Sequence, residues 1–358
     1  MGKIETHRFP CGTCGSDLRF APGERLLRCD HCGATEPMPA ASPWDRSAVA
    51  ELDLRSAVED TLPEAQMEET RVVQCSSCGA QVEFDPNEHA AECPFCATPI
   101  VTDTGINRHI KPRGILPFDI DQTGGRDAMR KWMRGLWFAP NALKKYARSD
   151  QKLQGIYLPY WTFDAQSQTE YRGQRGTRYS RTVGSGKNRR TVSEIRWRRK
   201  SGRISHFFND VLVTGSRTLP DDQVRKVSHF DLAVLEPYRP QFLAGFRAEA
   251  YSIDVMEAKN LAHALMEEET RQLIKRDIGG DAQRIDDMRM ALSEMTYKHI
   301  LVPVWIAAYR FRGKSYRFVV NARTGAVAGE RPWSPVKIAF AVILGLIAAA
   351  VIAYFTQR

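Results

Sequence analysis

The chain has 358 residues, of which 43% are hydrophobic and 26% charged, and this ordinary globular composition excludes wholesale disorder and low-complexity behaviour. Its eight cysteines are too few for a small scaffold stapled by disulfides. The net charge of +9 is unevenly distributed: residues 1–107 carry −10, residues 108–203 carry +16 and residues 204–358 carry +3. The length predicts two or three folded units. The charge distribution gives the chain an acidic head and a basic middle, and this asymmetry is more informative about partners than the net charge.

All eight cysteines lie near the N-terminus and form two matched sets. In each set, two C-x2-C pairs are separated by fourteen residues, and the sets are offset by 64 residues. Each C-x2-C turn offers two thiolates, and the residues between the turns form a hairpin that completes a tetrahedral zinc site. We therefore predict two zinc ions per chain. The two ligand sets are Cys11, Cys14, Cys29 and Cys32, and Cys75, Cys78, Cys93 and Cys96.

The spacing predicts one zinc ribbon over residues 1–36 and a second over 71–107, joined by an acidic linker with a short helix over 37–70. Iron held by the same thiolates is the alternative that this pattern leaves open. Four thiolates on a divalent ion add about −2 to each site, so the head would repel a phosphate backbone. This electrostatic balance favours protein docking by the ribbons, in a compartment that keeps thiols reduced.

Beyond residue 107, strand-like and helix-like patterns alternate and predict an α+β fold. The first series is a strand over 116–121, a helix through residues 129–137 and a strand over 158–171. It continues into a hairpin over 172–203.

A second series follows the same order. It has a long helix, a break at residues 279–281 and a second helix to about Met295. The apolar side of the long helix is predicted to hold Leu261, Leu265, Leu273 and Ile274. The last strands fall at 302–309 and on either side of a turn within 316–327.

Two short motifs recur in the two series. Pro159-x-Trp161 returns as Pro303-x-Trp305, and the pattern aromatic-x-Ile-Asp at 118–121 returns at 251–254. We predict two related halves over 108–203 and 204–332, each an antiparallel sheet covered by helices, with both tryptophans buried in core strands.

The hairpin over 172–203 carries a net charge of +11 in 32 residues, with a Gly-rich centre typical of a β-turn. We interpret it either as a solvated hairpin that balances the acidic head or as a site for anionic lipid headgroups or nucleic acid. Its basic residues are Arg172, Arg175, Arg178, Arg181, Lys187, Arg189, Arg190, Arg196, Arg198, Arg199, Lys200 and Arg203.

A transmembrane helix is predicted over residues 336–355. Ile338 to Phe355 is a run of eighteen residues without a charge, which as a helix spans roughly 27 Å, close to the ~30 Å of a bilayer core. Basic residues before it agree with a cytoplasmic body. Four small residues recur along one face and would allow a homodimer, although an Ala-rich span also produces such a stripe by composition alone. They are Ala341, Gly345, Ala349 and Ala353.

No motif specifies catalysis. The segment Gly184-Ser185-Gly186-Lys187 lacks both the earlier glycine and the following Ser or Thr of a phosphate-binding loop. No nucleophile elbow occurs, so we expect no enzymatic activity.

The twin ribbons, the two Pro-x-Trp strands, the segment YRPQFLAGF at 238–246 and the apolar tail carry a family resemblance. The chain resembles, over nearly its whole length, bacterial membrane-anchored zinc-ribbon proteins of unknown function. Such sequences are often labelled primosomal protein N′ (replication factor Y), a superfamily II helicase, which implies DNA replication. The present chain lacks the ATP-binding motif that helicase activity requires. The resemblance also implies a band-7 (SPFH) membrane scaffold as a partner.

Together these features predict a non-enzymatic, tail-anchored zinc-ribbon adaptor at the cytoplasmic face of a bacterial inner membrane. It would be a single-pass protein with its N-terminal bulk in the cytoplasm, and it would bind protein partners and anionic lipid. The alternative is a nucleic-acid-binding protein linked to DNA replication, whose basic hairpin contacts phosphates.

Overall fold

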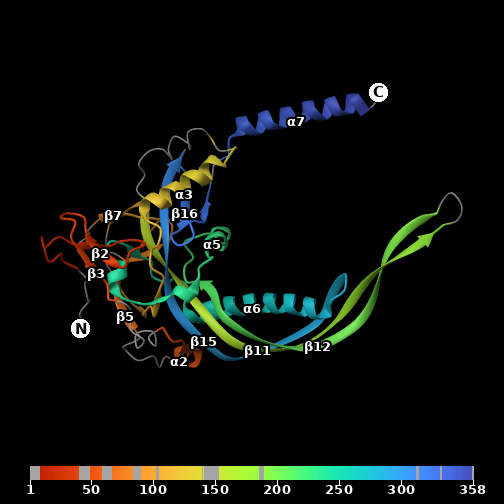
Figure 1. Cartoon of the computed structure of the whole chain (residues 1–358), viewed down its shortest axis with the longest axis horizontal. Helices are drawn as coiled ribbons and strands as arrows, with labels where there is room; N and C mark the ends of the chain where they lie inside the picture. Colours follow the sequence, from red (N-terminus) through yellow and green to blue (C-terminus); the bar gives the residue numbers. More distant parts are fainter. Residues whose placement is uncertain are drawn as a thin grey trace.

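The computed structural model describes residues 9–39, 49–58, 67–83, 90–101, 105–138, 140, 153–184, 189–311, 314–330 and 333–356. Within these residues the fold is mixed α+β and consists mostly of strands, with two small cysteine-containing units beside one large curved sheet (Figure 1). One apolar helix at the C-terminal end, α7 (Pro335–Thr356), extends away from this body.

The large sheet has nine described strands. The central order is β12-β11-β15-β10-β13, with β14 on β11, β16 and β4 on β15, and β17 on β16. Their bounds are β4 (Leu52–Asp53), β10 (Gly114–Ile115), β11 (Gln154–Val183), β12 (Arg190–Thr214), β13 (Glu236–Pro237), β14 (Arg247–Ala248), β15 (Ala282–Phe311), β16 (Lys314–Asn321) and β17 (Val327–Gly329). Strands from both predicted halves thus share one sheet, whereas we expected a sheet in each half.

Short elements cover or flank this sheet. The helices are α2 (Leu54–Val58), α3 (Gln122–Arg134), α5 (Asp221–Val227) and α6 (Val255–Ile278), with single turns η3 (Leu232–Val234) and η4 (Pro240–Leu243). The strands of the cysteine units are β1 (Leu18–Phe20), β2 (Leu26–Cys29), β3 (Thr35–Pro37), β5 (Met67–Gln74), β6 (Gln81–Glu83), β7 (Ala90–Glu92), β8 (Pro99–Val101) and β9 (Gly105–Ile110).

Helix α6 lies along the concave side of the three long strands β11, β12 and β15 (Figure 1). Its buried positions recur every three or four residues and include Ala258, Ala262 and Met266, so the small alanines let the helix approach the sheet closely. The predicted apolar side was right at Ile274, which is buried, and Leu273 is half-buried. It was wrong at Leu261 and Leu265, which are 41% and 51% exposed.

The two Pro-x-Trp motifs lie side by side on neighbouring antiparallel strands. Leu158 on β11 pairs with Val302 on β15, and the two motifs extend from this pair in opposite directions. Each of these strands also pairs with a short parallel strand at the equivalent place. Ile115 on β10 pairs with Leu301, next to Val302, and Ala248 on β14 pairs with Tyr157, next to Leu158. The environments of the two motifs are therefore related by a local two-fold arrangement.

Both tryptophans are buried as predicted, and each makes one equivalent hydrogen bond. The indole N–H of Trp161 donates to the Ile253 carbonyl at 2.9 Å, and that of Trp305 donates to the Ile120 carbonyl at 2.8 Å. The aspartate after each isoleucine caps a helix, α6 in the first case and α3 in the second. Each indole thus anchors the start of a helix from the other half of the sequence.

The second helix predicted to end near Met295 is wrong, because residues 282–295 belong to strand β15. Met288, Met290 and Leu292 alternate with exposed residues and pair with β11, on the side of the sheet that α6 covers. This period of two belongs to a half-buried strand. Individual helix propensities are weak, and pairing with a neighbouring strand overrides them.

The strand predicted over residues 116–121 is also wrong, since β10 covers only Gly114–Ile115. Beyond β10 the backbone amide of Leu116 still donates to the Leu301 carbonyl at 2.9 Å, and those of Asp119 and Ile120 turn to the carbonyl of Ala322. The chain therefore leaves the sheet early in order to begin α3.

Candidate metal centres

Two groups of four cysteine sulfur atoms converge, and they are the two predicted ligand sets. In the first, Cys11 Sγ lies 3.6 Å from Cys32 Sγ, and Cys14 Sγ lies 3.5 Å from Cys29 Sγ. A tetrahedral zinc ion with Zn–S bonds of about 2.3 Å separates its sulfur ligands by about 3.8 Å.

The second group has the same geometry. The Sγ atoms of Cys75 and Cys96 lie 3.6 Å apart, and those of Cys78 and Cys93 are separated by the same 3.6 Å. All four sulfur atoms in each group fall within 4.8 Å of one another, so each group is positioned to bind one zinc ion.

The metal-binding turns share one backbone conformation. The residue four positions after the first cysteine of each pair has a positive φ, and its N–H donates to the carbonyl of that cysteine at 2.8 to 3.0 Å. Glycine occupies this position in three turns, as Gly15, Gly33 and Gly79, which suits a left-handed backbone. Ala97 occupies it in the fourth turn, with φ of 56°.

Backbone amides in these turns also stabilise the thiolates. Hydrogen bonds from the backbone of Thr13 and Cys14 lower the pKa of Cys11 to about 7. A backbone hydrogen bond from Cys32 likewise lowers the pKa of Cys29. Because zinc binds the deprotonated form of cysteine, these amides favour the metal-binding form of Cys11 and Cys29. Hydrogen bonds with the neighbouring thiols raise the pKa of Cys14 and of Cys32.

Ribbon 1, formed by β1 to β3, packs on the segment that carried part of the family resemblance. The ring of Phe20 meets that of Phe242 edge-on at 5.3 Å, and the amide of Phe20 donates to the Ala244 carbonyl at 2.9 Å. Sequence reasoning singled out YRPQFLAGF as a motif but missed this role. Its aromatic residues are the only signal that could have suggested a packing surface.

Ribbon 2 packs on the next part of the same segment. Val82 on β6 forms a bridge with Glu249, and the amide of Ala250 donates to the Gln81 carbonyl at 3.0 Å. Both ribbons are therefore docked on the large sheet through residues 240–250.

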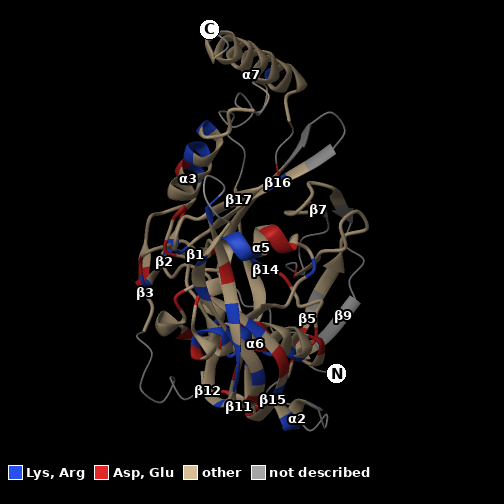
Figure 2. Cartoon of the chain, turned by 90° about the vertical axis from the view of Figure 1, so that its right-hand side faces the viewer, with Lys and Arg blue, Asp and Glu red and all other residues tan. Residues whose placement is uncertain are grey.

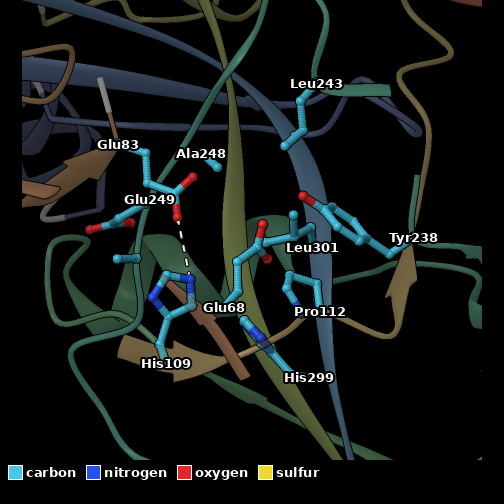
Figure 3. A pocket seen from close by; sticks show the side chains of 11 residues that line it. Glu68, Glu83, His109, Pro112, Tyr238, Leu243, Ala248, Glu249, His299 and Leu301 are labelled. Carbon is cyan, nitrogen blue, oxygen red and sulfur yellow. Dashed lines mark ion pairs between the residues drawn. The ribbon is translucent and has the colours of Figure 1, made fainter. Parts of the chain in front are cut away.

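A small polar cavity lies where ribbon 2 meets the sheet (Figure 3). Its carboxylates are Glu68, Glu83 and Glu249, and its imidazoles are His109 and His299. The Nε2 atom of His109 lies 3.7 Å from Glu83 Oε1, the contact drawn as a dashed line. With a volume of about 10 Å³, the cavity has room for no more than about one water molecule.

Burial in this cavity favours the uncharged forms of Glu83, Glu249 and His299. Burial raises the pKa of Glu249 and of Glu83 to about 7 and lowers the pKa of His299 to about 3. The ring of His299 is oriented by its Nδ1 atom, 2.8 Å from the Ile110 carbonyl. We interpret the cavity as a buried polar junction between two structural units.

A third group of metal-ligand type combines Glu51, Asp164 and Asp210. The ammonium of Lys298 lies 2.9 Å from Glu51 Oε1 and 2.8 Å from Asp210 Oδ1. Lysine thus supplies the positive charge that these carboxylates need. Since Glu51 comes from the linker between the ribbons and Lys298 from β15, this ion network ties the linker to the sheet.

The basic hairpin over 172–203 forms as predicted, from the distal parts of β11 and β12. β15 accompanies it only as far as the Gly176–Ala282 pair, so the outer part is a two-stranded arm (Figure 1). Four of its basic residues pair with carboxylates: Arg172, Arg181, Lys200 and Arg203. Lys187, at the turn, lies outside the described residues.

The side chains of the other arginines of the hairpin have no carboxylate partner among the described residues. Arg175 and Arg198 are both exposed and lie directly opposite one another on the two strands. Arg196 stacks on the ring of Tyr179 at 5.1 Å. Figure 2 shows Lys and Arg along the length of β11 and β12.

Comparison with known proteins gives one distant relative. The chain is 23% identical over 332 residues, 92% of each protein, to the uncharacterized protein YdjG of Bacillus subtilis (strain 168). No protein-family model matches the chain, and no solved structure matches it.

Proposed function

We propose that this protein is a non-enzymatic adaptor of a bacterial inner membrane, anchored by α7 with its ribbons and sheet in the cytoplasm. The observation that carries the proposal is the contrast between α7 and the rest of the chain. α7 is long and apolar enough to cross a membrane and no part of it is buried in the body. An aqueous environment would leave this apolar surface uncovered, whereas a bilayer would solvate it.

The two zinc ribbons would then be the parts that present protein-binding surfaces. Their fixed position on the sheet supports a scaffold role, because rigid units need not lose conformational entropy when a partner binds. A band-7 (SPFH) membrane scaffold is the partner that the family resemblance implies. We also propose that the two halves of the body are copies of one β-α-β-β unit, supported by their matching helix caps and tryptophan bonds.

Within this function, we propose that the basic hairpin binds an anionic membrane surface. Like charges directly opposite one another destabilise a sheet, so Arg175 and Arg198 favour an anion between or above them. The hairpin and α7 also leave the body on the same side (Figure 1).

The second candidate is a nucleic-acid-binding protein. The observation in its favour is the aromatic content of the same hairpin, since Trp197 and Tyr179 stand among the arginines. Aromatic rings beside basic groups are typical of single-stranded nucleic acid sites.

Flotation of a protein lacking residues 333–358 with liposomes, beside a DNA-binding assay, separates the two candidates. Removing α7 exposes no core, because the helix is not buried. We expect flotation with vesicles containing phosphatidylglycerol and none with neutral phosphatidylcholine. Because each basic residue contributes about 1 kcal/mol near an anionic surface, the double variant Arg175→Gln/Arg198→Gln should reduce partitioning roughly 30-fold.

The matched control is Arg172→Gln/Arg203→Gln, which removes the same charge from residues that are already paired with carboxylates. We expect a smaller loss from this control. Tight, salt-sensitive DNA binding without binding to anionic vesicles would reverse the ranking of the two candidates.

A further inference from the structure

Only two of the six described tryptophans are exposed, and they lie together at the base of α7. Trp137 is 71% exposed and Trp333 is 56% exposed, whereas Trp161 and Trp305 are buried. Trp333 stands just before α7 in the sequence. Trp137 is almost two hundred residues earlier, beyond the C-terminal end of α3, and only the fold brings its segment to the base of α7, where its backbone carbonyl contacts Lys337.

Direct contacts hold the end of α3 against the start of α7. The amide of Ser334 donates to the Phe138 carbonyl at 2.8 Å, and the ammonium of Lys337 donates to the Trp137 carbonyl at 3.2 Å. The rings of Phe138 and Trp333 lie 6.1 Å apart. Figure 1 shows α3 running towards the base of α7.

An open apolar groove continues from this contact onto the first turns of α7. It is lined by Phe138, Trp333, Ile338, Ala341 and Val342. The last turn of α3 is basic, with Lys131 and Arg134 (Figure 2). Exposed aromatic rings beside basic side chains, at the end of an apolar helix, are typical of the interface between lipid headgroups and acyl chains.

We propose that Trp137 and Phe138 form a second, non-spanning membrane contact that lies at the lipid headgroup level beside the first turn of α7. This inference rests on the proposed membrane anchoring by α7. The occupant of the groove is lipid, because the groove is continuous with the apolar surface of α7 and has no polar lining residue. The contact would fix the depth and the orientation of the body at the membrane.

The inference is testable with the full-length protein containing 5-fluorotryptophan, in nanodiscs of phosphatidylcholine and phosphatidylglycerol. The ¹⁹F resonances are assigned with Trp137→Phe, Trp333→Phe and Trp132→Phe. Line broadening is measured with a lipid that carries a nitroxide near the headgroup, and separately with a water-soluble gadolinium chelate. Trp132 is the internal control, because it lies on α3 one to two turns before Trp137 and packs against Phe318 at 5.3 Å.

We expect the nitroxide lipid to broaden the resonances of Trp137 and Trp333 several-fold more than that of Trp132. The soluble chelate should leave Trp137 largely unaffected. The inference would be overturned if the nitroxide lipid broadened the resonance of Trp333 while only the soluble chelate broadened that of Trp137. The anchoring proposal would then remain intact. If neither tryptophan responds to the lipid, or the protein does not remain with the nanodiscs, the proposed anchoring itself fails and the inference fails with it.

Discussion

At the scale of single residues, the fourth metal-binding turn differs from the other three. Ala97 adopts φ of 56° at the position where Gly15, Gly33 and Gly79 have φ near 75°. A left-handed backbone costs a residue with a Cβ about 1 to 2 kcal/mol. The zinc site of the second ribbon therefore includes a strained backbone at Ala97, whereas the glycines of the first ribbon adopt the same conformation without strain.

We predict that Ala97→Gly raises the zinc affinity of the second site, by about 1 kcal/mol or roughly five-fold, because the strain is removed. Competition with a chromogenic chelator measures this affinity. The control is Gly79→Ala, at the equivalent position of the same ribbon, where an added Cβ would meet no atom within 4 Å. This control should weaken binding by a similar factor, and an unchanged affinity in both variants would show that the turn conformation has no influence.

Glu249 is a second residue whose native environment is unfavourable, because burial disfavours its charged form. It is 2% exposed, and burial raises its pKa to about 7 from an ordinary 4.5. A carboxyl with a raised pKa favours folding below its unfolded pKa, and this stability is lost as the pH rises through the folded value. The hydroxyls of Ser216 and Thr218 donate to its Oε1 atom, and a glutamine could accept the same bonds.

We predict that the free energy of unfolding of the zinc-loaded protein falls by about 1 kcal/mol more between pH 6 and pH 8 in the parent than in Glu249→Gln. Chemical denaturation at the two pH values measures the difference. The exposed substitution Glu268→Gln serves as the control and should keep the parent's pH dependence. A Glu249→Gln variant with the parent's pH dependence would contradict the buried, proton-binding state of this carboxyl.

At the scale of elements, α7 is a helix that packs none of its faces into the body of the protein. None of its residues is buried, and a Cβ added at Gly345 would meet no atom within 4 Å. Gly345, Ala349 and Ala353 are exposed and therefore open to another helix, whereas Ala341, the first residue of the stripe, lines the groove beside Phe138. In lipid, close backbone approach drives helix association where hydrophobicity cannot.

We predict that Gly345→Leu weakens self-association of the full-length protein while it leaves membrane insertion intact. A two-hybrid assay in the membrane measures association, and alkaline extraction measures insertion. Leu344→Ala, on a different face of α7, is the control and should associate like the parent. Equal association of Gly345→Leu and the parent would mean that the stripe reflects composition only.

At the scale of the whole molecule, the cysteine units and the sheet share hydrophobic cores. Cys11 and Phe20 of ribbon 1 belong to one buried cluster with Phe118 and Trp305 of the body, and ribbon 2 shares a second cluster with Leu158. Since zinc holds each ribbon together, metal binding and the stability of the body are coupled through these clusters.

We predict that the purified protein contains about two zinc ions per chain and that chelation increases hydrogen exchange in the body as well as in the ribbons. In the body, the amides to follow are those of Phe246 and Glu249, which donate to the carbonyls of Leu243 and Tyr157 beside the two junctions. In ribbon 1, the amide of Phe20 is followed. The amide of Met290, where β15 pairs with β11 far from the ribbons, is the control. Faster exchange confined to the ribbons would show that the units are independent.

Local chemistry explains why the metal centres and α7 were predictable. A zinc site depends on cysteine spacing within two short turns, and Cys11, Cys29 and their partners meet as their spacing requires. A helix long and apolar enough to cross a membrane depends on a continuous apolar run such as Ile338–Phe355. The hairpin was also predictable, because its charge and its Gly-rich turn lie within one segment of the chain. None of these features needs a residue far away in the sequence.

The tertiary structure decided what depends on distant partners. Residues 282–295 form a strand because β11 pairs with them and α6 covers one side, and no local propensity encodes that pairing. The docking of the ribbons on residues 240–250 and the meeting of Trp137 with the base of α7 have the same origin. Burial of a surface depends on what the rest of the chain brings to it, so only the complete fold determines these contacts.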